Sequence, residues 1–144
     1  MPGGALLDTG PLVAYLYPRD SHHDWAIDLF AAATVPFLTC EAVVTEACFL
    51  AARNGQPVFV LQLLDSGVVR VGLDIEDECQ AVQALMRRYV NVPMSLADAC
   101  LVRMAEMTGL PICTLDSDFT IYRSRRGRAL DLLSPPTPRS LHEP

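Results

Sequence analysis

Short apolar runs alternate along the chain with longer stretches in which apolar side chains recur at the spacing of an α-helix. The short runs are bounded by Gly, Pro or polar residues, as is typical of buried strands, and lie at residues 5–7, 35–39, 67–71, 110–115 and 129–133. The longer stretches predict helices at residues 11–16, 22–30, 41–52, 57–64, 74–89 and 95–108. This alternation of strands and helices predicts an α/β fold with a mostly parallel sheet.

Capping residues indicate where several of the helices begin and end. Thr9 is expected to cap the first helix, with Pro11 in its first turn. Ser95 is expected to cap a later helix, with Asp98 as the third residue of a capping box and Gly109 at the other end. In the helix predicted at residues 74–89, the side chains expected to face the core are Ile75, Cys79, Val82, Leu85, Met86 and Tyr89.

The length of 144 residues is sufficient for one domain with a hydrophobic core. We expect a single domain over residues 1–133 and a flexible tail over the Pro-rich residues 134–144. No apolar run approaches the roughly 20 residues of a membrane span, and the N-terminus lacks the basic region of a secretory signal. We therefore expect a cytoplasmic protein that does not interact with a membrane.

The cysteines and the absence of lysine exclude several kinds of chemistry. The five cysteines lie apart in apolar surroundings without the spacing of a zinc site. We expect them to be buried free thiols: Cys40, Cys48, Cys79, Cys100 and Cys113. The chain has no lysine, which excludes a Walker A phosphate site and Schiff-base catalysis.

All eleven basic residues are arginines, and the net charge of −6 argues against general binding of polyanions. Four arginines nevertheless fall within six residues: Arg123, Arg125, Arg126 and Arg128. Such a run is usually a solvated surface. The alternative is a local patch that contacts phosphate groups or a partner protein.

Four acidic residues lie in apolar surroundings, where an isolated carboxylate is unfavourable unless it is paired, neutralised or bound to a cation. Asp8 and Asp116 follow predicted strands, and Asp98 lies in the first turn of a predicted helix. Glu46 lies in the middle of a predicted helix with apolar neighbours, so we expect it to be buried. Because ligands bind outside the carboxyl ends of parallel strands, the four carboxylates are expected to form one site for a divalent cation. The alternatives are that Asp8 is a simple turn residue and that Asp98 only caps its helix.

Four motifs in a fixed order resemble those of PIN-domain proteins. The first is Leu-Leu-Asp-Thr-Gly-Pro-Leu-Val-Ala at residues 6–14, which contains Asp8. The others, with their acidic residues, are Val44–Ala47 (Glu46), Ser95–Ala99 (Asp98) and Thr114–Phe119 (Asp116). Each motif alone is common, but the ordered set is specific, and the resemblance covers residues 5–133. The small size further resembles the VapC-type toxin ribonucleases of bacterial toxin–antitoxin pairs.

The resemblance implies a three-layer sandwich, with about five short strands flanked by helices, that cleaves RNA with Mg²⁺ or Mn²⁺. It also implies a homodimer that is inhibited by a cognate antitoxin protein. The open alternatives are a PIN nuclease that processes RNA outside a toxin pair and an inactive PIN-like module that binds RNA or protein. Phosphatases of the haloacid dehalogenase type and response-regulator receivers are disfavoured, because both ordinarily use a lysine.

The resemblance implies roles for individual residues. Asp8 and Asp98 are the expected direct metal ligands, and Asp116 is the third, either directly or through water. Glu46 completes the catalytic acids, where it holds a second ion or directs a metal-activated water. In-line attack by that water would leave a 5′-phosphate and a 3′-hydroxyl. The residues expected to orient the carboxylates or water are Thr9, Thr114 and, at a position that varies in the family, Asp118.

Overall fold

The computed structural model describes residues 3–53 and 56–136. Its described strands form one sheet in the order β3-β2-β1-β4-β5, in which every pair of neighbours is parallel. The strands are shorter than the apolar runs that predict them: β1 Leu6–Leu7, β2 Phe37–Thr39, β3 Val69–Val71, β4 Ile112–Cys113 and β5 Leu132–Leu133. The central strand β1 pairs with both β2 and β4, since Leu6 is in register with Leu38 and with Ile112.

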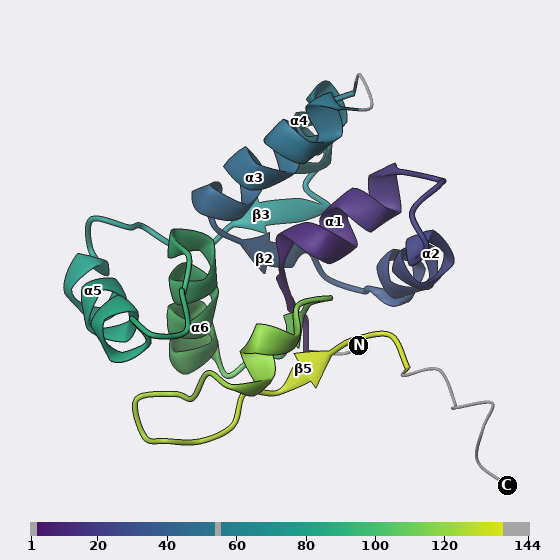
Figure 1. Ribbon diagram of the computed structural model, residues 1–144. Helices are drawn as coiled ribbons and strands as arrows, with labels where there is room; N and C mark the ends of the chain where they lie inside the picture. The colour runs from purple at the N-terminus through teal and green to yellow at the C-terminus, as the bar shows by residue number, and fades with distance from the viewer. Residues whose placement is uncertain (1–2, 54–55, 137–144) are drawn as a thin grey trace, which may run out of the picture.

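The helices connect the strands and cover both faces of the sheet. In Figure 1, α5 and α6 lie together on one side of the molecule, and α1 to α4 lie on the other. Their bounds are α1 Thr9–Leu16, α2 His23–Ala32, α3 Glu41–Ala52, α4 Val58–Asp65, α5 Cys79–Arg88 and α6 Leu96–Thr108, and a short 3₁₀ helix, η1, spans Ser117–Thr120. The alternation of strands and helices therefore predicts the α/β fold correctly.

The two faces of the sheet are buried in separate hydrophobic cores. Leu6 and Ile112 pack with residues of α5 and α6, whereas the next residue of each strand, Leu7 or Cys113, packs with residues of α1, α3 and α4. This is the alternation expected of a strand that is covered on both faces. It confirms the three-layer arrangement.

The helix predicted at residues 74–89 begins later than expected. Residues 75–78 form turns, because the Asp74 carboxylate accepts hydrogen bonds from the backbone N–H groups of Glu76 and Asp77. A side chain that binds nearby backbone groups in this way competes with helix formation. The helix starts only at Cys79.

Only part of the predicted inward face of this segment reaches the core. Val82, Leu85 and Tyr89 are buried as predicted. Ile75, Cys79 and Met86 are exposed, so their predicted inward orientation is wrong. Of the five cysteines, three are buried free thiols, while Cys79 is exposed and Cys48 is half-buried.

Gly109 ends α6 as predicted, since it adopts a left-handed backbone conformation with φ of 70°. No helix in the described residues is both long and apolar enough to cross a membrane. The division into a domain at 1–133 and a tail at 134–144 stays a prediction, and most of the predicted tail lies outside the described residues.

Candidate active site

Asp8 lies immediately after β1 and is almost fully buried, with 7 % of its surface exposed. One carboxylate oxygen, Oδ1, accepts a hydrogen bond of 2.8 Å from the Thr9 backbone N–H. The other, Oδ2, accepts one of 2.7 Å from the Thr114 hydroxyl beyond β4. Asp8 itself is therefore the N-cap of α1, and the prediction that Thr9 caps this helix is wrong. The physical reason is that Asp8 has the extended backbone and the short acceptor side chain of an N-cap.

Glu46 reaches the same region from α3, but it is not buried. The buried positions of α3 are Val43, Ala47 and Ala51, which recur every four residues along one side of the helix, and Glu46 falls beside that stripe. The prediction of a buried glutamate is therefore wrong, since Glu46 is exposed. The Thr9 hydroxyl donates a hydrogen bond of 3.1 Å to Glu46 Oε2, which links this carboxylate to the residue next to Asp8.

Asp98 lies in the first turn of α6 and forms the predicted capping box with Ser95. The Asp98 backbone N–H donates to Ser95 Oγ over 3.1 Å, and the Ser95 N–H donates to Asp98 Oδ2 over 3.4 Å. Asp98 does more than cap, because Oδ2 also accepts a hydrogen bond of 3.0 Å from the Tyr122 hydroxyl. Capping and a place in the acidic site are thus compatible roles for one side chain.

Tyr122 is the residue of this site that sequence reasoning missed. Its side chain is fully buried, and its ring makes edge contacts with Phe119 at 5.3 Å and Tyr89 at 5.1 Å between centroids. The available signal was weak: Tyr122 follows Phe119 by three residues, the spacing of one helical turn, which indicates a core aromatic rather than a partner for Asp98.

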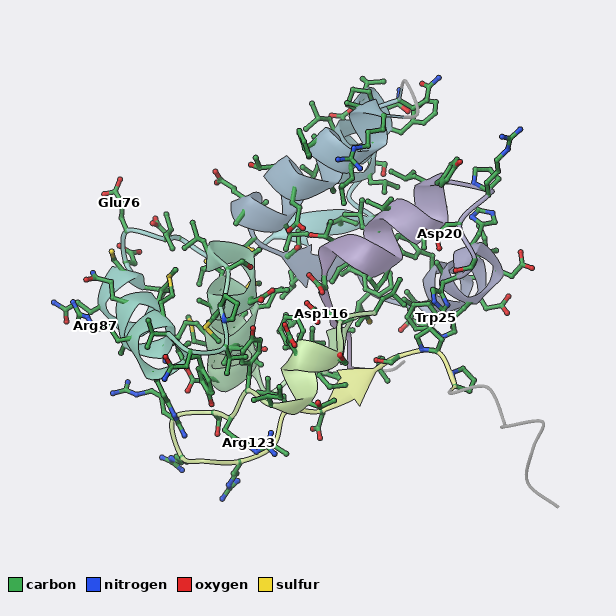
Figure 2. The ribbon with its side chains drawn as sticks, in the orientation of Figure 1. Asp20, Trp25, Glu76, Arg87, Asp116 and Arg123 are labelled. Carbon is green, nitrogen blue, oxygen red and sulfur yellow. The ribbon has the colours of Figure 1, made fainter. Side chains whose placement is uncertain are left out.

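Asp116 lies beyond β4, on the segment that leads into η1. Its side chain is exposed, and its Oδ1 accepts a hydrogen bond of 2.9 Å from the Asp118 N–H, so that Asp116 caps η1. The Asp116 backbone N–H donates to Thr114 Oγ1 over 3.0 Å. The buried Thr114 hydroxyl therefore joins the Asp8 carboxylate to the backbone of Asp116. Figure 2 shows Asp116 near the centre of the molecule.

The electrostatics indicate that the acids influence one another. Burial raises the pKa of Asp8 to about 6, opposed by the hydrogen bonds from Thr114 and Thr9, and the charges of Asp98 and Glu46 raise it further. Burial is also the main cause that raises the pKa of Asp98, and the charge of Asp116 adds to it. Carboxylates from β1, α3, α6 and the segment after β4 therefore repel one another at one end of the sheet.

The donor atoms of this site suit a hard cation such as Mg²⁺. They are carboxylate oxygens, and a cation would relieve their mutual repulsion. Within the part of the chain that the structure describes, no three His, Cys, Asp or Glu side chains are grouped closely enough to hold an ion. Mg²⁺ is usually held by only one or two carboxylates together with water and substrate phosphate. The carboxylate donors of this site are therefore of the kind that such an ion prefers, and Asp98 is the acid whose charge acts most strongly on Asp8.

The arginine run begins beside Tyr122, but its tip lies apart from the acidic site. The backbone N–H of Arg125 donates to the carboxylate of Glu106, which follows Asp98 by eight residues on α6. Eight residues correspond to about 12 Å along a helix axis. Arg123 uses its guanidinium to bind the backbone carbonyls of Thr120 and Tyr122. In Figure 2, Arg123 lies on the loop that leads away from Asp116.

Comparisons with known proteins agree with this arrangement. The family model of the PIN domain matches residues 5–124. The solved structures that resemble the chain include the crystal structure of VapC20 from Mycobacterium tuberculosis, described as a toxin that cleaves the sarcin–ricin loop. That match has a TM-score of 0.73 and 24 % sequence identity, and covers 82 % of this chain and 94 % of VapC20. A search of curated proteins finds no match.

Proposed function

The chain belongs to the PIN-domain family, and from this premise we propose that it is a divalent-metal-dependent endoribonuclease. The observation that carries the proposal is the environment of the Asp8 carboxylate. Its two oxygens accept hydrogen bonds from the Thr9 N–H and the Thr114 hydroxyl. The charges of Asp98 and Glu46 lie near enough to raise its pKa. A buried carboxylate with such neighbours is typical of a functional site, since its charged form is unfavourable without a cation.

The residues that would hold Mg²⁺ or Mn²⁺ are Asp8 and Asp98, with Asp116 directly or through water. When bound, the ion would lower the pKa of water and neutralise charge on the phosphate. The chain supplies the orientation. The Thr114 hydroxyl fixes one oxygen of Asp8, and the Tyr122 hydroxyl fixes Oδ2 of Asp98. Outer hydrogen bonds of this kind hold ligand carboxylates in one orientation before the ion arrives.

Glu46 suits a different role from the buried acids. It is exposed and is linked to the site through the Thr9 hydroxyl, so it can accept a proton from, or orient, an incoming water molecule. Attack of water on phosphorus with departure of the 3′ oxygen yields a 5′-phosphate and a 3′-hydroxyl. No histidine or lysine is required for this reaction.

The biological role that we propose is the toxin of a type II toxin–antitoxin pair. The support is the similarity in fold to VapC20, described as a toxin that cleaves the sarcin–ricin loop. Under this proposal the substrate is RNA, a cognate antitoxin protein is the inhibitory partner, and the active form is a homodimer in the cytoplasm. The target RNA of this chain is a separate question, since the similarity concerns the fold.

The test is a cleavage assay with structured and single-stranded RNA in Mg²⁺, Mn²⁺ or EDTA, followed by analysis of the product ends. The proposal predicts cleavage in either metal, none in EDTA, and products with 5′-phosphates. A matched control is Asp65→Asn, which removes an exposed carboxylate at the end of α4 and should leave activity unchanged. Cleavage that persists in EDTA, or RNA binding without any cleavage, would contradict the proposal, and the latter would favour an inactive binding module.

A further inference from the structure

Residues 123–129 form a well-defined turn, which we call the arginine turn. Arg123 and Ala129 form an antiparallel bridge, and the Ser124 N–H donates to the Arg128 carbonyl over 2.9 Å. Gly127 donates its N–H to the Ser124 carbonyl over 2.8 Å and has a φ of 75°, which only glycine adopts readily. The segment is therefore a closed hairpin turn with a defined backbone.

The backbone of the arginine turn is attached to α6 and to the end of α5. Glu106 of α6 accepts the Arg125 N–H, and its side chain is 6 % exposed. The hydroxyl of Tyr89 accepts the Arg123 N–H over 2.6 Å, and the Arg88 guanidinium donates to the Ser124 carbonyl over 3.2 Å. These contacts hold the turn in a fixed position relative to the helix that carries Asp98.

The guanidinium groups at the tip of the turn, unlike that of Arg123, are free within the described residues. Arg125, Arg126 and Arg128 are exposed, and no hydrogen bond or ion pair of their guanidinium groups occurs within the described residues. By comparison, the Arg103 guanidinium pairs with Glu78 at 2.8 Å. These three arginines line a cleft of about 760 Å³ together with Arg103 and two acidic residues, Glu106 and Asp131. The turn thus presents unpaired cations on a rigid backbone.

We infer that the arginine turn is a second RNA-contacting surface, which binds phosphates upstream or downstream of the bond cleaved at the acidic site. This inference rests on the proposed function. A guanidinium presents a planar set of donors that matches phosphate oxygens. Glu106 lies about 12 Å along α6 from Asp98, which corresponds to at least three nucleotides at roughly 3.4 Å per stacked nucleotide.

The surroundings of the turn favour RNA over a protein partner. Its tip is Arg-Arg-Gly-Arg and offers no apolar side chain. Large exposed apolar side chains lie outside the tip, as Val90, Met107 and Ile121 in the neighbouring segments and as Phe49, Val58 and Leu61 on α3 and α4. A protein interface needs a hydrophobic centre, whereas phosphate binding needs only well-placed cations. Because the whole chain carries a net charge of −6, attraction of RNA must come from a local patch of this kind.

The experiment replaces three arginines by glutamine: Arg125, Arg126 and Arg128. The matched control, with the same change of charge, replaces three exposed arginines on other parts of the surface: Arg19, Arg70 and Arg87. Binding of an RNA hairpin of about 20 nucleotides is measured by fluorescence anisotropy in EDTA over a range of salt concentrations. With a slope of about 0.7 per phosphate contact, the triple variant should lose about two from the slope of log K against log salt and bind roughly 100-fold more weakly at 0.1 M salt.

A kinetic comparison separates this inference from the proposed function. The triple variant should raise KM for the hairpin while kcat stays unchanged, and kcat/KM for a dinucleotide, which is too short to reach the turn from the acidic site, should equal that of the wild type. Equal salt slopes in the triple variant and the control would overturn the inference, as would loss of binding to an acidic peptide with unchanged RNA binding. A wild-type protein that cleaves no RNA would overturn the proposed function, and the binding comparison in EDTA would still decide the inference.

Discussion

Replacement of Asp8 by Asn should stabilise the metal-free protein at neutral pH. Asp8 is almost fully buried, and burial raises its pKa to about 6, well above the ordinary value of 3.8. The substitution keeps the size of the side chain and removes the charge. If Asp8 only capped α1, the substitution should instead destabilise the protein, because Asn has one acceptor oxygen fewer than Asp.

The magnitude follows from the pKa difference. Two pKa units correspond to about 3 kcal/mol of destabilisation of the folded protein when Asp8 is charged. Asn retains one of the two acceptor oxygens that bind Thr9 and Thr114, and a lost hydrogen bond costs about 1 kcal/mol. The net gain at pH 7 is therefore about 2 kcal/mol, a rise in Tm of roughly 5–8 °C for a chain of this length.

The effect has a defined pH dependence. Below about pH 4 the Asp8 carboxyl is protonated in both the folded and the unfolded wild type, so the stabilisation that its raised pKa provides is fully present. That stabilisation is lost as the pH rises through 6. Asp8→Asn should therefore be slightly less stable than the wild type at pH 4 and more stable at pH 7.

The assay is thermal and urea unfolding of the two proteins in EDTA between pH 4 and pH 8. Asp65→Asn, at an exposed position, serves as the control and should show no such crossover. Addition of Mg²⁺ should stabilise the wild type and leave Asp8→Asn unchanged, because only the wild type offers the complete site. A variant that is less stable than the wild type at every pH would refute the argument that a buried charge strains this site.

Three further substitutions test individual contacts. Asp98→Asn should abolish cleavage in Mg²⁺ while unfolding in EDTA shows equal or greater stability, and a large loss of stability would instead favour a role in capping with Ser95 alone. Tyr122→Phe should raise the Mg²⁺ concentration for half-maximal activity about 10-fold and weaken Mn²⁺ binding measured by calorimetry, while Tm changes by only a few degrees. Unchanged metal affinity would show that the Tyr122 hydroxyl does not orient Asp98. Gly10→Ala should destabilise the fold by about 1–3 kcal/mol in urea unfolding, because the added Cβ would lie 3.1 Å from the side chain of Leu115. Unchanged stability would show that the Leu115 side chain can move to accommodate the methyl group.

The fold was largely predictable because its signals are local. The helix at residues 41–52 is found with both predicted ends, and the capping box at Ser95 and the stop at Gly109 occur as expected. Alternation of apolar runs and amphipathic stretches predicts parallel strands without knowledge of their order. The strand order, with β1 between β2 and β4, depends on contacts between distant segments.

The failures have identifiable physical causes. The helix start was misplaced because the Asp74 side chain satisfies backbone N–H groups in a turn. The exposure of Glu46 was missed because apolar neighbours in the sequence do not show which side of a helix is buried. The contact between Tyr122 and Asp98 joins residues 24 positions apart, and no local pattern encodes it. The cap of α1 was assigned one residue late because Asp and Thr are both good N-caps.

The most direct test of the acidic site is a calorimetric titration of the wild type and of Asp8→Asn with Mn²⁺, with RNA cleavage measured on the same samples. The wild type should bind Mn²⁺ and cleave RNA, and Asp8→Asn should lose both while it remains folded. Equal Mn²⁺ binding and equal cleavage by the two proteins would contradict a metal-dependent nuclease site built on Asp8.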